Sequence, residues 1–291
     1  MTVKQSDAAE VPVPLAVRLL LGRAAVQVIA SDAGADLLHI KGNAVDTSLR
    51  VREAPGTDID VMARPTHVPR LHDELLRHGW VVYSSFRYGS PFGHAQTYRH
   101  PDWGYLDLHR MFPGIRLDPE AAFDELWRDH GTRDFAGTDG AVPSLTGQAV
   151  LLVLNDVRSR RAARAIATWV DRPGLDRSEV SALVERLDAR VAFAAATGDL
   201  ERYRGERDYR LWKGITQGST RTGEWWARVR AARTLREALG IVVRAPLANV
   251  ERLTHQLGRS PTRAEVLRAT AMRPVRAVRE LVAGARRRVR P

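Results

Sequence analysis

The chain has 291 residues, of which 44% are hydrophobic and 27% charged, so it has the composition of a folded protein large enough for two domains. It contains no cysteine, which excludes disulfide frameworks, thiolate nucleophiles and cysteine-ligated zinc sites. The sequence has no apolar run long enough to span a membrane, and the N-terminal segment lacks the pattern of a signal peptide. We therefore expect a cytoplasmic protein with no membrane partner.

The positive charge of the chain is concentrated in its last third. The formal net charge is +11, and residues 202–291 hold 22 basic and 7 acidic side chains, whereas residues 1–116 hold 13 and 12. Such a basic segment is typical of a surface for an anionic partner such as nucleic acid. The other interpretation is a solvated surface in a chain that uses arginine almost everywhere, since only Lys4, Lys41 and Lys213 are lysines.

The first 116 residues predict an α/β or α+β domain, with a mixed sheet and flanking helices. Apolar residues recur at helical spacing in some segments and alternate in others, and Gly/Pro-rich turns separate them. In chain order we expect a helix at 14–34, a strand at 37–40, a helix at 43–51, a strand at 58–63, a helix at 65–77, and strands at 80–83, 94–100 and 105–110.

From residue 119 onward the apolar pattern becomes helical. The expected helices are at 121–127, 146–170, 177–197 and 224–240. Residues 131–144 are rich in glycine, threonine and aspartate, which is typical of a linker. We therefore expect a first domain at 1–130, followed by an all-α, basic C-terminal domain at 145–291.

Two aspartates flank a single isoleucine in the strand expected at 58–63. Because side chains alternate along a strand, Asp58 and Asp60 point the same way. Two like charges held this close repel unless solvent, basic neighbours or a bound cation relieve them. Asp107, on a later strand, supplies a third carboxylate. Three convergent carboxylates are what a two-metal phosphoryl or nucleotidyl transfer requires.

A lysine and a glycine follow the strand expected at 37–40. At the start of a helix, free backbone N–H groups and the helix dipole favour a phosphate. Lys41 would add a compact positive charge there, although a surface lysine at a strand end is the other interpretation. His109 lies two residues after Asp107 and would share its side of the strand, as a substrate contact or as a second hydrogen-bonding shell around the carboxylate.

These pieces occur in a characteristic order. HIKG ends at Gly42 and is followed 16 residues later by DIDV, then by a helix ending in HGW and by a strand YLDLHR. In this order the chain resembles the uncharacterised nucleotidyltransferase family of the DNA polymerase β-like nucleotidyltransferase superfamily, over roughly residues 14–112. The resemblance implies a nucleotidyltransferase-like catalytic domain that moves a nucleoside monophosphate from an NTP to an acceptor hydroxyl and releases pyrophosphate.

The resemblance also implies roles for individual residues. Asp58 and Asp60 would bind two Mg²⁺ ions, with Mn²⁺ as the alternative, and Asp107 would share one ion and help to activate the acceptor hydroxyl. The basic residue that the family has shortly before the acidic pair has no counterpart at Ala54, so a nearby arginine would replace it. The nucleotide-binding residues implied are Lys41, Gly42, Asn43, Arg50 and Arg52. The acceptor is left open between RNA such as a tRNA end, a small molecule and a protein side chain.

A separate pattern covers residues 248–283. It predicts a helix, a turn with Ser260 or Thr262 as cap, a second helix, and a third after Pro274. The stretch LTHQLGRSPTRAEV is similar to helix-turn-helix repeats of bacterial sigma factors, which implies a helix in the major groove of DNA. A compact three-helix packing unit is the other interpretation. The alternative function is therefore a DNA-binding regulator whose N-terminal domain is a nucleotide sensor or an inactive remnant.

Overall fold

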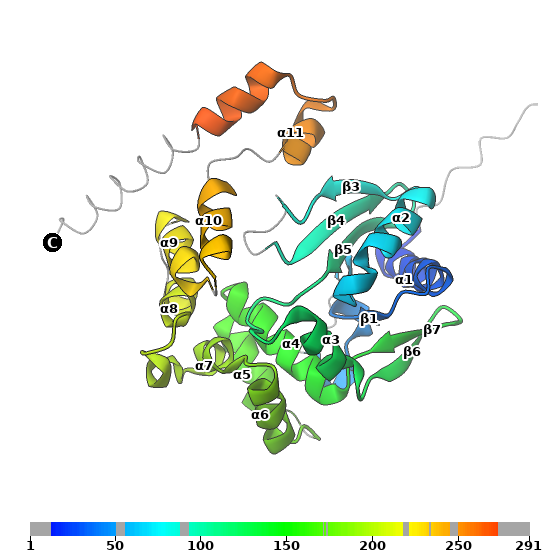
Figure 1. Ribbon diagram of the computed structural model, residues 1–291. Helices are drawn as coiled ribbons and strands as arrows, with labels where there is room; N and C mark the ends of the chain where they lie inside the picture. Colours follow the sequence, from blue (N-terminus) through cyan, green and yellow to red (C-terminus); the bar gives the residue numbers. More distant parts are fainter. Residues whose placement is uncertain are drawn as a thin grey trace, which may run out of the picture.

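The structure is a computed structural model that describes residues 13–50, 56–87, 93–170, 172, 174–217, 221–232, 234–244 and 250–272. It has a mixed α/β architecture, in which helices pack against a mixed five-stranded sheet and a separate two-stranded hairpin lies at the edge of the molecule (Figure 1). None of the helices within these residues combines the length and the apolar character needed to cross a membrane.

The five strands expected from the sequence are confirmed, and they form one sheet in the order β1-β2-β5-β4-β3. The strands β2 and β5 are parallel, and the other neighbouring pairs are antiparallel. The bounds are β1 Leu37–His39, β2 Ile59–Ala63, β3 Val81–Ser84, β4 Ala95–His100 and β5 Gly104–His109.

One face of this sheet is apolar along its length. Alternate residues of the two parallel strands, such as Ile59 and Leu106, pack against α1 (Leu15–Asp32) and α2 (Val68–Arg77). On the opposite face only one end is apolar, since Met62 joins a larger core cluster there. The remaining part of that second face carries the carboxylates of the two parallel strands.

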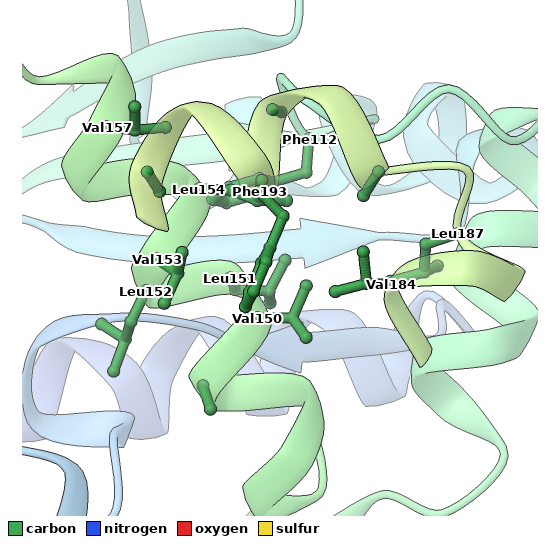
Figure 2. Packing of buried hydrophobic residues seen from close by; sticks show 14 of the residues in the cluster. Phe112, Val150, Leu151, Leu152, Val153, Leu154, Val157, Val184, Leu187 and Phe193 are labelled. Carbon is green, nitrogen blue, oxygen red and sulfur yellow. The ribbon is translucent and has the colours of Figure 1, made fainter. Parts of the chain in front are cut away.

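Helix α4 (Leu145–Arg158) is the centre of the larger core cluster. Every residue of α4 from Gly147 to Val157 is buried, which is typical of a helix surrounded by other elements (Figure 2). The labelled helices that follow are α5 Ala162–Val170, α6 Arg177–Arg186, α7 Arg190–Thr197, α8 Tyr209–Gln217, α9 Arg221–Ala231, α10 Leu235–Arg244 and α11 Val250–Leu257, with a further helix at 263–272, and α3 Pro119–Trp127 precedes them. The division into two domains stays a prediction.

The segment expected as a linker at 131–144 is instead a β-hairpin, so that expectation was wrong. Strands β6 (Gly131–Phe135) and β7 (Thr138–Val142) pair around a two-residue turn, Ala136-Gly137. Both turn residues have positive φ, 53° and 82°, which is the backbone of a type I′ turn and matches the twist of a hairpin. The buried Phe135 and Val142 attach the hairpin to the rest of the protein.

Four helices expected from the sequence are shorter or broken in the structure. The segment expected as one helix at 224–240 belongs to two helices, α9 and α10. Residues 42–50 contain two 3₁₀ turns, Gly42–Ala44 and Thr47–Leu49, because Asp46 accepts a hydrogen bond from the Ser48 N–H and starts a new turn. Residues 146–170 and 177–197 are each broken once. The breaks lie at Arg160 and Asp188, which have φ values of 58° and 47° and so leave the helical conformation.

The helix-turn-helix prediction lies partly within the described residues. Helix α11, which packs against β3, is followed by a turn and a helix at 263–272. Thr262 and Glu265 bond reciprocally: Thr262 N donates to the Glu265 carboxylate at 2.7 Å, and Glu265 N donates to Thr262 Oγ1 at 3.3 Å. This is a capping box, as expected for Thr262. The expected third helix lies outside the described residues, and DNA binding stays a prediction.

Candidate functional site

Two carboxylates converge across the parallel strands β2 and β5. Asp60 lies opposite Asp107 in the strand register, and Thr97 of β4 lies opposite Asp107 on the other side. Paired residues of neighbouring strands project to the same face of the sheet, so the three side chains form one row. Thr97 Oγ1 donates to Asp107 Oδ1 at 2.6 Å. The fold thus brings together acidic residues that are 47 positions apart in the chain.

Asp60 is a buried carboxylate whose charge is balanced by its neighbours. Lys41 Nζ forms an ion pair with Asp60 Oδ1, and His109 Nε2 lies 3.1 Å from the same oxygen. Burial acts to raise the pKa of Asp60, but the Lys41 charge and the His109 hydrogen bond outweigh it and hold this pKa well below its usual range. Asp60 is therefore ionised at neutral pH.

The pKa values of Asp107 and His109 are shifted in opposite directions from their usual values. Burial raises the pKa of Asp107 to about 6, and the charge of Asp60 adds to this effect. Burial lowers the pKa of His109 to about 4, and the nearby Lys41 ammonium adds to it. At neutral pH His109 is therefore a neutral imidazole that can act as a ligand. Asp107 changes charge close to neutrality, which suits a group that accepts a proton.

Within the described part of the chain, one group of side chains that could hold a metal ion is Asp60, Asp107 and His109. Each offers one donor atom, and these three atoms lie within 4.8 Å of one another. Two carboxylate oxygens and one imidazole nitrogen fit a divalent ion such as Mn²⁺, whereas Mg²⁺ prefers oxygen alone. Compared with the three carboxylates expected from the sequence, the donor group contains His109 in the place of Asp58.

Asp58 lies just before β2 and is only half-buried. Burial raises the pKa of Asp58, and the charge of Asp60 adds to this effect. Thr57 Oγ1 lies 3.5 Å from Asp58 Oδ1. Together with Asp107, Asp58 lines a pocket of about 650 Å³ that opens beside the row of carboxylates. Its role as a metal ligand stays a prediction.

The chain turns sharply at Lys41-Gly42. Lys41 has φ 58° and ψ 176°, and Gly42 has φ 54°. The buried guanidinium of Arg23, from α1, donates to the carbonyl of Lys41 at 3.0 Å and to the carbonyl of Asp60 at 3.2 Å. A Cβ atom at Gly42 would lie 3.2 Å from Arg23 Nη2, so both the positive φ and this contact favour glycine. Arg23 thereby joins the turn to β2.

The other nucleotide-binding residues expected from the sequence lie in the loop after this turn. Arg50 donates to the carbonyl of Val45 at 3.1 Å and to that of Asn43 at 3.0 Å, so part of its guanidinium holds the loop together. Arg52 lies outside the described residues. A contact of Asn43, Arg50 or Arg52 with a nucleotide stays a prediction.

Arg158, at the end of α4, is a cation near the carboxylates that sequence reasoning missed. Its Nη1 lies 2.9 Å from Nε2 of the buried His94, whose ring lies 5.3 Å from that of His109. Arg158 Nε is buried and has no hydrogen-bond partner among the described residues. Burial lowers the pKa of Arg158, while the charges of Asp60 and Asp107 act in the opposite direction.

Arg23 was also missed, although the sequence contains a signal for it. It interrupts the apolar run LLLGRAAVQVIA, and a charged side chain on the buried face of a helix needs polar partners. Its partners in the structure are backbone carbonyls and His39. Arg158 gives no such signal, because a basic residue in the last turn of a helix is common.

Comparisons with known proteins add little to this geometry. No protein-family model matches the chain, and no curated protein matches it. Among solved structures, the chain is similar to the lincomycin-bound lincosamide antibiotic adenylyltransferase LnuA, with 13% sequence identity and a TM-score of 0.32. The match covers 58% of this chain and 96% of that one. A likeness of this size carries no argument about function, which must come from the site itself.

Proposed function

We propose that the protein is a metal-dependent nucleotidyltransferase that moves a nucleoside monophosphate from an NTP to an acceptor hydroxyl. The observation that carries the proposal is the convergence of Asp60 and Asp107 on paired parallel strands, with the Lys41 ammonium against Asp60. Carboxylates gathered beside a cation are the groups that phosphoryl chemistry uses.

The donor group Asp60, Asp107 and His109 would hold one divalent cation, and Asp58 would contribute to a second. Such ions, when bound, supply positive charge to the phosphates and to the attacking oxygen. Mn²⁺ and Mg²⁺ are both candidates, and the imidazole favours Mn²⁺.

Side chains of the protein would bind the phosphates and accept the proton. Lys41 and Arg158 would bind phosphate oxygens, and Gly42 would let the backbone approach them closely. The acceptor oxygen forms a bond to the α-phosphorus, the bond to the bridging oxygen breaks, and pyrophosphate leaves. The acceptor proton passes to the Asp107 carboxylate, with Thr97 orienting it.

The test is incubation with each radiolabelled NTP, with Mg²⁺ or Mn²⁺, and with total RNA or cell extract as acceptor source. We expect label transfer by the wild type and at least a 100-fold loss, the usual scale for general acid–base catalysis, in Asp60→Asn and in Asp107→Asn. Asp129→Asn, an exposed carboxylate, is the matched control. Transfer that survives in both site variants would contradict the proposed site.

The alternative hypothesis, a DNA-binding regulator, makes a different prediction in the same preparation. A regulator would bind duplex DNA with sequence preference and would transfer no label from any NTP. Sequence-independent binding that weakens steeply with salt would reflect only the basic surface.

A further inference from the structure

The pocket beside the carboxylates is lined by two chemically different groups of side chains. One group is the acidic pair Asp58 and Asp107; the other contains Arg18, Arg99, Trp103 and Tyr105, and we call it the rim. Its volume of about 650 Å³ is within the range of small-molecule sites. Neither Lys41 nor Gly42 lines it, so the pocket approaches the carboxylates from a different direction than the expected phosphate turn.

The two arginines of the rim come from different elements. Arg18 lies on α1, and its Nε is buried without a hydrogen-bond partner among the described residues. Arg99 lies on β4 and is exposed. A phosphate group in the pocket would accept charge-assisted hydrogen bonds from both guanidinium groups. The rim therefore favours an anionic ligand.

The same rim offers flat aromatic surfaces. Trp103 stacks on His100, with ring centroids 6.1 Å apart and an angle of 23° between the rings, and Tyr105 meets Tyr83 edge to face. Trp103 is held close to α1 because residue 22 is a glycine: a Cβ there would lie 3.3 Å from Trp103 Cβ. Fixed aromatic side chains beside cations are a common platform for nucleobases.

We propose that this pocket binds the acceptor of the transfer reaction and that the acceptor is a nucleotide with a free ribose hydroxyl. Its phosphate would contact Arg18 and Arg99, its base would lie against Trp103 or Tyr105, and its hydroxyl would reach Asp107. The 3′ end of an RNA and a free mononucleotide share this chemistry. A cationic acceptor would be repelled by the two arginines. The inference rests on the proposed function for the identity of the reaction.

The experiment measures binding without turnover. An eight-nucleotide single-stranded RNA with a 5′ fluorescent label is titrated with the full chain in EDTA, and anisotropy is followed at several salt concentrations. We expect Arg18→Gln and Arg99→Gln each to weaken binding about 5- to 10-fold and to reduce the salt slope by about 0.7, the value for one phosphate contact on a single strand. Arg77→Gln, an exposed arginine on α2, should leave the affinity unchanged.

Unlabelled competitors distinguish an RNA end from a free mononucleotide, and an ATP analogue tests whether the pocket holds the acceptor or the NTP. Displacement by AMP at low concentration points to a free mononucleotide, whereas displacement only by unlabelled RNA points to an RNA end. Equal affinity of wild type, Arg18→Gln and Arg99→Gln would overturn the proposal. So would loss of binding of a non-hydrolysable ATP analogue in the same two variants, because the pocket would then hold the NTP. Loss of label transfer with intact, arginine-dependent RNA binding would instead count against the nucleotidyltransferase function.

Discussion

At the scale of single residues, Lys41 combines a strained backbone with a paired side chain. Its φ of 58° and ψ of 176° lie in a region that is almost exclusive to glycine, at a cost of about 1–3 kcal/mol. Arg23 holds its carbonyl, and Asp60 holds its ammonium. A lysine kept in a glycine conformation indicates that the ammonium is needed at this position.

This strain predicts an unusual order of stability among variants of Lys41. Lys41→Met removes the charge that neutralises the buried Asp60 and keeps the strain. Lys41→Gly removes the same charge but relieves the strain, so we expect it to be more stable than Lys41→Met by about 1–2 kcal/mol, although glycine is the smaller residue. Urea unfolding of the three proteins measures the difference. A Lys41→Gly protein that is less stable than Lys41→Met would show that the backbone is relaxed there.

Asp107 predicts a pH dependence of stability in protein freed of metal by EDTA. Its pKa is raised from 3.8 to about 6 on folding, so the folded state binds a proton more tightly than the unfolded state. The stability due to this group is fully present below pH 3.8 and is lost as the pH rises through 6. At pH 8 we therefore expect Asp107→Asn to be more stable than the wild type by about 1–3 kcal/mol, at 1.36 kcal/mol per pKa unit.

Unfolding by urea at pH 8 and at pH 4.5 checks this sign. The advantage of Asp107→Asn should shrink at the lower pH, and Asp129→Asn, with an exposed carboxyl group, should show no such trend. Because the amide oxygen of asparagine can still accept the Thr97 hydrogen bond, the substitution changes the charge with little change in packing.

At the scale of elements, the hairpin β6–β7 supports the candidate site indirectly, through its contacts with residues that surround Arg23. It packs against α1 and β1, and its Gly140 lies against His39, which in turn contacts Arg23. The Arg23 guanidinium also lies 5.7 Å from the centre of the Phe135 ring. The hairpin therefore fixes the arginine that holds the Lys41-Gly42 turn.

Two glycines of the hairpin form a matched pair for testing this support. A Cβ at Gly140 would lie 2.8 Å from Phe135 and 2.9 Å from His39, whereas at Gly131 the nearest atom, of Val142, is 3.9 Å away. We expect Gly140→Ala to destabilise the protein by about 1–3 kcal/mol through overpacking, and Gly131→Ala to have little effect. Thermal unfolding compares them. Equal thermal stability of Gly140→Ala and Gly131→Ala would show that the hairpin is not tightly packed against His39.

The elements that sequence predicted well are those with a strong local pattern. The strands were found because short apolar runs or alternating apolar residues lie between turns, and helix α1 because its apolar residues recur at helical spacing. The hairpin was missed because its buried side chains, Phe135 and Val142, are few and its glycines resemble a linker. The helix breaks at Arg160 and Asp188 were missed because arginine does not predict a positive φ and because a single aspartate within a helical pattern is only a weak signal for one.

At the scale of the whole molecule, the candidate site depends on which strands become neighbours. Asp60 and Asp107 meet because β5 inserts beside β2, although two strands and a helix separate them in the chain. Local sequence patterns do not specify this order. The family resemblance supplied the expectation that Asp107 belongs with the acidic pair, and the strand register supplies the physical reason. His109 was expected beside Asp107 because both lie on the same side of one strand, whereas Arg158 joins the site only through the tertiary fold.

Metal binding links this site to the stability of the molecule. A ligand that binds only the native state stabilises it by about 2.7 kcal/mol at 100 times its dissociation constant. Because the donor group of Asp60, Asp107 and His109 includes an imidazole, we expect Mn²⁺ to raise Tm more than Mg²⁺ at equal concentration. His109→Asn should remove most of the preference for Mn²⁺, and Asp60→Asn combined with Asp107→Asn should abolish both shifts.

Replacing Lys41 tests whether the metal ion binds at Asp60, because the Lys41 ammonium and a divalent cation compete for the same Asp60 oxygen. Lys41→Met should therefore show a larger Tm increase with Mn²⁺ than the wild type, while its Tm without metal is lower. Differential scanning calorimetry with and without Mn²⁺ measures both quantities in one series. An unchanged Mn²⁺ shift in Lys41→Met would mean that the ion does not bind at Asp60. A Tm increase with Mn²⁺ that persists when Asp60→Asn and Asp107→Asn are combined would mean that the ion binds elsewhere in the protein.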